Sequence, residues 1–215
     1  MSREVFITGA SGYIGRSLCA RLHERGHAVR ALVRSGSESR LPPGPLPVRG
    51  NALDAASYRD AVAPCDTFVH LVGTPHPSPA KARQFREVDL VSIREAVAAA
   101  THACVRHFVY LSVAHPAPVM AAYIDVRKEG EALVRTSGMA ATFVRPWYVL
   151  GPGHRWPLAL LPVYRLMELI PATREAAMRL GLVTLDQLVA TLAGAVEHPP
   201  SDVRVLNVPD IRKRR

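Results

Sequence analysis

The chain has 215 residues, of which 48% are apolar and 21% are charged, the ordinary balance of a globular protein. This length suits one domain with a core of its own and excludes a disordered chain, a collagen and a disulfide scaffold. The formal net charge is +9, but the arginines are scattered along the sequence, which argues against a protein that binds nucleic acid. Three cysteines without a C-x-x-C pair predict no disulfide framework and no thiolate metal site.

The sequence predicts neither a signal peptide nor a membrane-spanning segment. The first residues, MSREVFITGASGYIG, lack an apolar segment followed by a cleavage site, so we expect a cytoplasmic protein without a signal peptide. The most apolar later stretch, 156–170, is broken by charges and prolines and is too short for a membrane span. We expect it to line a substrate pocket, with peripheral contact to a membrane or a partner subunit as the alternative.

Short β-rich runs alternate with helical patterns, and this alternation predicts βαβ units with a parallel sheet. We expect strands at residues 5–8, 28–33, 46–49, 67–72, 107–112 and 142–145. Helices are expected from about residue 14 to Gly26, near 55–63, over 88–100 and over 120–137. The fold class is therefore α/β, a doubly wound and mostly parallel sheet with helices on both faces.

A final helix is marked by its own start signals. Thr184 and Gln187 have the spacing of a capping box, and Val183 and Leu188 have that of a hydrophobic staple. We expect this helix to end near Glu197, with one more edge strand at 203–208. Residues 1–153 then form the part that binds a cofactor, and residues 154–215 a small substrate-side region packed on the same domain.

The segment T-G-A-S-G-Y-I-G places Gly9, Gly12 and Gly15 between the first strand and the first helix. Glycines permit a tight turn and a close approach of backbone N–H groups to a pyrophosphate, whose charge is favoured at a helix N-terminus. This context predicts a dinucleotide site of the Rossmann type, with a purely structural glycine turn as the alternative. The same turn contributes Ser11, Tyr13 and Ile14 to the predicted cofactor site.

The second strand ends at Arg34, where an acidic residue would bind the ribose 2′-hydroxyl of NAD. A guanidinium suits a 2′-phosphate instead, because it pairs with phosphate through two parallel hydrogen bonds. The alternative is a solvated arginine in an arginine-rich protein. We therefore expect NADP (NADPH) rather than NAD as the cofactor.

Further segments follow in a specific order: Gly50-Asn51-Ala52-Leu53-Asp54, Val69-His70-Leu71-Val72-Gly73, Phe108-Val109-Tyr110-Leu111-Ser112, Tyr123, Val144-Arg145-Pro146 and Leu150-Gly151-Pro152-Gly153. With the glycine motif, they resemble the extended and atypical short-chain dehydrogenase/reductases, which are related to NAD-dependent epimerases and dehydratases. The resemblance is strongest to NAD(P)-binding proteins similar to NmrA and to a complex I accessory subunit. It implies that these residues line the cofactor: Asn51, Ala52, Leu71, Val72, Gly73, Pro146, Tyr148 and Val149. Asn51 stands where the family usually has Asp.

Dehydrogenases of this family use a Ser or Thr, a Tyr and a Lys in the pattern Y-x-x-x-K, and the resemblance assigns three catalytic residues here. Tyr123 is the proton donor, Ser112 orients the substrate oxygen, and Arg127 stands in place of the lysine. Arg127 shares a helical face with Tyr123 and is also cationic, although its guanidinium is bulkier and planar. Lys128 is rotated about 100° away on such a helix and does not substitute.

These residues predict an NADP-dependent oxidoreductase that acts on a small carbonyl or quinone-like substrate. The alternative is a non-catalytic NAD(P)H-binding sensor or assembly protein, in which Arg127 records the loss of hydride chemistry. The nine histidines show no metal-ligand spacing, so we assign no metal site.

Overall fold

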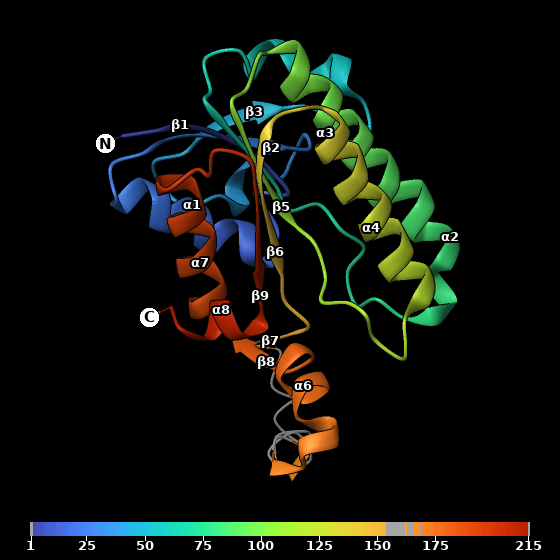
Figure 1. Cartoon of the computed structure of the whole chain (residues 1–215). Coiled ribbons are helices and arrows are strands. Elements are labelled where there is room, and N and C mark those ends of the chain that lie inside the picture. Colours follow the sequence, from blue (N-terminus) through green and yellow to red (C-terminus); the bar gives the residue numbers. More distant parts are fainter. Residues whose placement is uncertain (1, 154–161, 163–165, 168, 215) are drawn as a thin grey trace.

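The computed structural model describes residues 2–153, 162, 166–167 and 169–214. Seven parallel strands form the central sheet in the order β3-β2-β1-β4-β5-β6-β9 (Figure 1). Their bounds are β1 (Glu4–Thr8), β2 (Ala28–Val33), β3 (Leu46–Arg49), β4 (Thr67–His70), β5 (His107–Leu111), β6 (Ala140–Arg145) and β9 (Val203–Asn207). The predicted doubly wound parallel sheet is confirmed, with β9 as its edge strand.

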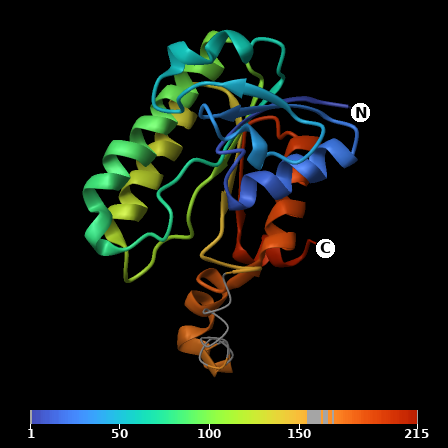
Figure 2. The same ribbon diagram turned by 180° about the vertical axis from the view of Figure 1, so that it is seen from behind.

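Helices cover both faces of this sheet, as Figures 1 and 2 show from opposite sides. One face carries α1 (Tyr13–Glu24), α7 (Leu185–Glu197) and α8 (Val208–Arg212); the other carries α3 (Val91–His102) and α4 (Ala121–Thr136). Side chains alternate along each strand, so Val5 and Ile7 of β1 pack toward α1 and α7, whereas Phe6 packs toward α3 and α4. Two apolar cores result, one on each face.

The connections differ in detail from the sequence-based expectation. The helix expected over 88–100 is α3, preceded by α2 (Ala82–Gln84) and by a π-helical turn at Phe85–Leu90. Residues 55–63 form two 3-10 turns, Ala55–Ser57 and Arg59–Ala61, rather than one helix, and further 3-10 turns lie at Glu38–Arg40 and Pro79–Lys81. Such tight turns carry no hydrophobic period by which a sequence could reveal them.

After β6 the chain leaves the main sheet. β7 (Tyr148–Leu150) and β8 (Leu182–Thr184) form a separate parallel pair, and α6 (Pro171–Arg179) stands out from the body of the molecule (Figures 1 and 2). None of these three elements was predicted. The stretch 156–170, expected as a pocket helix or a membrane contact, lies mostly outside the described residues. No helix of the described part is long and apolar enough to cross a bilayer.

The start of α7 is the local prediction that the structure matches most closely. Thr184 is its N-cap: the hydroxyl oxygen accepts a hydrogen bond from the Gln187 N–H at 3.1 Å, and the Thr184 N–H donates to Gln187 Oε1 at 3.0 Å. Both bonds of the predicted capping box are thus present, and the helix ends at Glu197 as expected.

The strand order creates one place suited to a ligand. The chain winds outward from β1 through β2 to β3 and then crosses back to β4 on the other side of β1. In open parallel sheets, ligands bind outside the carboxyl ends of the strands at such a reversal. The site is therefore expected where β1 and β4 end.

Candidate cofactor site and active site

The glycine turn lies at this reversal, between the end of β1 and the start of α1. Gly9 has a φ of +75°, and a Cβ there would lie 2.9 Å from the carbonyl carbon of Leu71, which follows β4. The N–H of Gly12 donates to Gly9 O at 3.0 Å and closes the turn. A Cβ at Gly15 would lie 2.7 Å from Ala10 O, so α1 approaches the turn only because its third residue lacks a side chain.

The first turn of α1 contains no acidic residue, and its N-cap is Gly12, which has no side chain to cap the helix. The positive end of the helix dipole therefore faces the reversal point without a built-in counter-charge. This arrangement is the cradle that a pyrophosphate requires, so the residues present fit a dinucleotide. The turn residues Ser11, Tyr13 and Ile14 are half-buried beside it.

The other predicted cofactor residues lie at the same edge of the sheet. Arg34 directly follows β2 and is exposed, and Asn51 follows β3. The loop at Asn51 is held by its own side chain, because Asn51 Oδ1 accepts a hydrogen bond from Leu53 N–H at 3.1 Å. On the other side of Gly9, the half-buried Leu71 and Val72 continue from β4. The structure thus brings the ends of four neighbouring strands together.

A buried histidine joins β1 to β4 beneath this edge. His70 is fully buried, and its Nδ1 is hydrogen-bonded to Thr8 Oγ1 at 2.8 Å, with Ser92 Oγ 3.4 Å from Nε2. Burial and then the nearby charge of Arg127 lower the pKa of His70 to about 3, so the ring is neutral. His70 is a structural link at the reversal point.

Arg127 is buried at the carboxyl ends of β4 and β5, with 4% of its surface exposed. Its Nη2 donates to Asp89 Oδ1 at 2.6 Å, and its Nη1 donates to Leu111 O at 3.0 Å. Gly73 makes room for it, because a Cβ at that position would collide with Nη2. The guanidinium is therefore fixed between a buried carboxylate and the backbone of β5.

Asp89, which no sequence motif marks, is the partner that holds this arginine. It is 1% exposed, and its second oxygen, Oδ2, accepts hydrogen bonds from Thr74 N–H at 3.0 Å and from Thr74 Oγ1 at 2.6 Å. Asp89 therefore ties Arg127 to the loop that follows Gly73. Its position in the π-helical turn, 38 residues from Arg127, left no local signal in the sequence.

Tyr123 lies one turn before Arg127 on α4, as the spacing predicted. It is half-buried, and its ring centroid is 5.1 Å from the Arg127 guanidinium carbon and 5.0 Å from the Phe85 ring centroid. The structure therefore brings the predicted proton donor and the predicted cation together.

Ser112 is placed differently from the other two predicted catalytic residues. It is buried, and its hydroxyl donates to Glu131 Oε1 at 2.6 Å. Arg145 Nε donates to the same oxygen at 2.8 Å, and Arg145 also forms an ion pair with Glu131 through Nη2. Ser112 thus belongs to a buried network with Glu131 and Arg145. The only signal for Glu131 is its helical spacing, four residues beyond Arg127.

The predicted nicotinamide pocket lies where β6 passes into β7. Pro146 is buried, and its carbonyl accepts a hydrogen bond from Ala114 N–H at 3.0 Å, which places this segment beside the end of β5. Tyr148 and Val149 are half-buried in β7. Trp147 packs against the core under α1 and α7, with its ring 5.7 Å from that of Tyr148.

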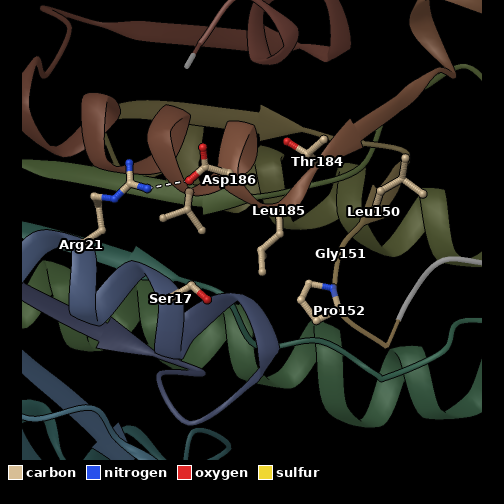
Figure 3. A pocket seen from close by; sticks show the side chains of 9 residues that line it. Ser17, Arg21, Leu150, Gly151, Pro152, Thr184, Leu185 and Asp186 are labelled. Carbon is tan, nitrogen blue, oxygen red and sulfur yellow. Dashed lines mark hydrogen bonds and ion pairs between the residues drawn. The ribbon is translucent and has the colours of Figure 1, made fainter.

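A hollow of about 490 Å³ opens elsewhere, between α1 and the start of α7 (Figure 3). Ser17 and Arg21 of α1 face Leu185 and Asp186 across it, and Arg21 Nη2 is paired with Asp186 Oδ1 at 2.6 Å. It contains none of the predicted site residues, so we do not assign the reaction to it.

The fold and the glycine turn together define a dinucleotide-binding α/β protein. The sequence pattern of the family described as NAD(P)H-binding matches residues 9–154, and the chain belongs to that family. The resemblance to NAD(P)-binding short-chain dehydrogenase/reductases is confirmed by this match.

Curated relatives extend the comparison. A ketoreductase of Stigmatella aurantiaca, named for 4-hydroxy-2-methyl-3-oxo-4-farnesyl-3,4-dihydroquinoline-1-oxide, is 28% identical over 81% of this chain and 56% of its own length. The ceramide reductase of Caulobacter vibrioides is also 28% identical, over 97% of this chain and 65% of its own length. The chain thus spans between about half and two thirds of these relatives.

Solved structures share the fold. The enzyme WbmH of Bordetella bronchiseptica, solved in complex with NAD⁺, superposes with a TM-score of 0.71 and 22% identity, over 95% of this chain and 75% of its own. At this identity the likeness establishes the architecture of the chain.

Proposed function

We propose that the protein is an NADP-dependent oxidoreductase in which Tyr123 exchanges a proton with the substrate oxygen. The observation that carries this proposal is the position of Tyr123, half-buried beside the fixed cation of Arg127 on the helix that borders the reversal point. A phenol at this position can exchange a proton with the oxygen of a bound carbonyl or alcohol. When bound, the nicotinamide of the dinucleotide would supply or accept the hydride.

The chain's own residues then have separate tasks. The glycine turn and the N-terminus of α1 would hold the pyrophosphate, and Leu71 to Gly73 would border the cofactor at the end of β4. Arg127 is hydrogen-bonded to Asp89 and to Leu111 O, so we assign it to positioning Tyr123 and the end of β5. This role differs from that of a lysine that binds a ribose directly.

The network of Ser112 limits what its hydroxyl can do. Because its hydrogen is donated to Glu131, the oxygen is left with lone pairs only. It can accept a hydrogen bond from a substrate alcohol, but it cannot donate to a carbonyl without leaving Glu131. We therefore propose that Ser112 orients the alcohol form of the substrate, and that Tyr123 serves the carbonyl form.

The preference for NADP rests on Arg34. It is exposed at the end of β2, where the 2′-position of an adenosine ribose would lie, and residues 34–37 contain no acid. Glu38, the next carboxylate along the chain, is paired with Arg49 at 2.7 Å. The charge at this position therefore favours a phosphate.

A small carbonyl or quinone-like compound remains our proposed substrate. Two curated relatives support the reduction of a substrate, since one is named a ketoreductase of a 3-oxo-4-farnesyl-dihydroquinoline oxide and the other a ceramide reductase. The small size and the quinone-like character are our own proposal. The alternative, a non-catalytic sensor, is favoured by one observation: both terminal nitrogens of Arg127 already have partners within the protein.

Cofactor titration and a tyrosine variant test the proposal. Wild type should bind NADPH more tightly than NADH, and Arg34→Asp should weaken NADPH binding by about tenfold or more, the value of one charge-assisted hydrogen bond, without a matching loss for NADH. Arg59→Asp makes the same charge change at an exposed arginine outside the site and should leave both affinities unchanged. Equal loss for both cofactors would contradict the assignment of Arg34.

Tyr123→Phe should abolish the oxidation of NADPH by a panel of ketones and quinones while NADPH still binds. Tyr58→Phe is the matched control. It also removes one phenol hydroxyl, but Tyr58 is buried in the core beside Phe6, so turnover should be unchanged. Turnover that survives in Tyr123→Phe would contradict the proton-exchanging role of Tyr123. Wild type that binds NADPH but turns over none of the panel would favour the sensor.

A further inference from the structure

A second cavity lies at the opposite edge of the sheet, where β4, β5 and β6 begin. Its volume is about 190 Å³, and its polar lining comes from Arg3, Asp66, Thr67, Arg106 and His107. The prolines at 199 and 200, which precede β9, close one side. The cofactor residues follow the carboxyl ends of the same strands, so this cavity is separated from them by the length of the sheet.

His107 is the feature that points to a ligand here. It is 2% exposed, and its Nε2 is 3.0 Å from Thr142 Oγ1, which also accepts a hydrogen bond from Arg204 Nη2 at 3.3 Å. Because the arginine is a donor, the Thr142 hydroxyl hydrogen is free to bond to His107 Nε2. In that arrangement the neutral ring would carry its hydrogen on Nδ1, which is buried and has no hydrogen-bond partner among the described residues.

The surrounding charges favour an anion. Burial, followed by the charges of Arg204 and Arg3, lowers the pKa of His107 to about 4, so the ring is a neutral donor at pH 7. Arg3 and Arg106 line the cavity, and among its described lining residues the one carboxylate is Asp66. That carboxylate is 4.0 Å from Arg3 and accepts a hydrogen bond from Thr67 Oγ1 at 2.8 Å.

We propose that this cavity binds a small oxyanion of the phosphate or sulfate class. The Nδ1–H of His107 would donate to one oxygen of the anion, and the guanidinium groups of Arg3 and Arg106 would neutralise its charge. A buried donor that lacks an acceptor is costly, and such an anion would satisfy it. The site is independent of the dinucleotide and of the proposed reaction.

Inorganic phosphate is the probe, and its binding to the 215-residue chain is followed by two-dimensional NMR at constant ionic strength, with sulfate and chloride titrated in parallel. Phosphate should cause saturable shifts of the His107 ring signals and of the Thr67 and His107 amides. Binding of phosphate to the glycine turn would move the Gly12 amide instead, so the two sites are distinguished in one spectrum.

Arg106→Gln changes an exposed side chain and should leave the fold intact. It should weaken the affinity for phosphate, measured from the titration of the His107 signals, by about tenfold or more. Arg3→Gln should act in the same direction. Arg174→Gln, an exposed arginine on α6, is the matched control and should change nothing. Shifts that do not saturate, that are equal with chloride, or that persist in Arg106→Gln would overturn the proposal.

Discussion

Replacement of Asp89 by Asn isolates the buried ion pair that organises the end of β4. The 2.6 Å pair between Asp89 and Arg127 joins side chains that are 0% and 4% exposed. The substitution keeps the shape but removes the negative charge, so a buried guanidinium loses its counter-charge. Breaking one partner of such a pair costs about 3–5 kcal/mol. The bonds from Thr74 belong to the same network, so their loss is not added separately.

The chain offers a matched control for this substitution. Arg94 of α3 and Glu129 of α4 form an ion pair at 2.7 Å, nearly the same length, but their side chains are 53% and 41% exposed. Glu129→Gln should therefore cost only about 0.2–1 kcal/mol, because water already screens both charges. The difference between the two variants measures the effect of burial.

Urea unfolding, followed by circular dichroism at one pH, gives the free energy of unfolding of each variant, provided that each unfolds in one transition with an unchanged slope. A loss in Asp89→Asn no larger than that in Glu129→Gln would refute the reasoning. If Asp89→Asn does not fold, the double variant Asp89→Asn/Arg127→Met tests the same point, because removal of both charges costs less than removal of one.

Two further predictions follow from backbone packing and from buried histidines. Gly15→Ala should destabilise the protein by about 1–3 kcal/mol and weaken NADPH binding, because its Cβ would lie 2.7 Å from Ala10 O. Gly194→Ala in α7 is the control: its Cβ would meet open space, so this variant should be neutral or stabilise the protein by up to about 1 kcal/mol. Thermal unfolding of both variants checks the sign of each change. The pKa of His70 is lowered from 6.5 to about 3 in the folded protein, so between these pH values the unfolded chain binds more protons than the folded one. The free energy of unfolding therefore decreases as the pH falls through this window, by roughly 5 kcal/mol at most. His70→Asn should flatten the dependence of urea unfolding on pH in this window; an unchanged slope would show that other groups cause it.

Features that depend on neighbouring residues were predicted well from the sequence. The glycine turn, the strands β1 to β6, the edge strand β9 and the capping box of α7 follow from turn chemistry, alternation and spacing within a few residues. The short strands β7 and β8 escaped prediction because three residues show no period. The pairing of Tyr123 with Arg127 was likewise predictable, since residues four apart share a helical face.

What surrounds that helical face was decided by tertiary structure alone. Helical spacing places Tyr123, Arg127 and Glu131 in one row, but it does not reveal that Arg127 meets Asp89 or that Ser112 donates its hydrogen to Glu131. These partners come from other elements, and each bond gains its strength from the exclusion of water when the elements pack. Backbone conformation is set locally, whereas the burial of a charge is set by segments that meet only in the folded protein.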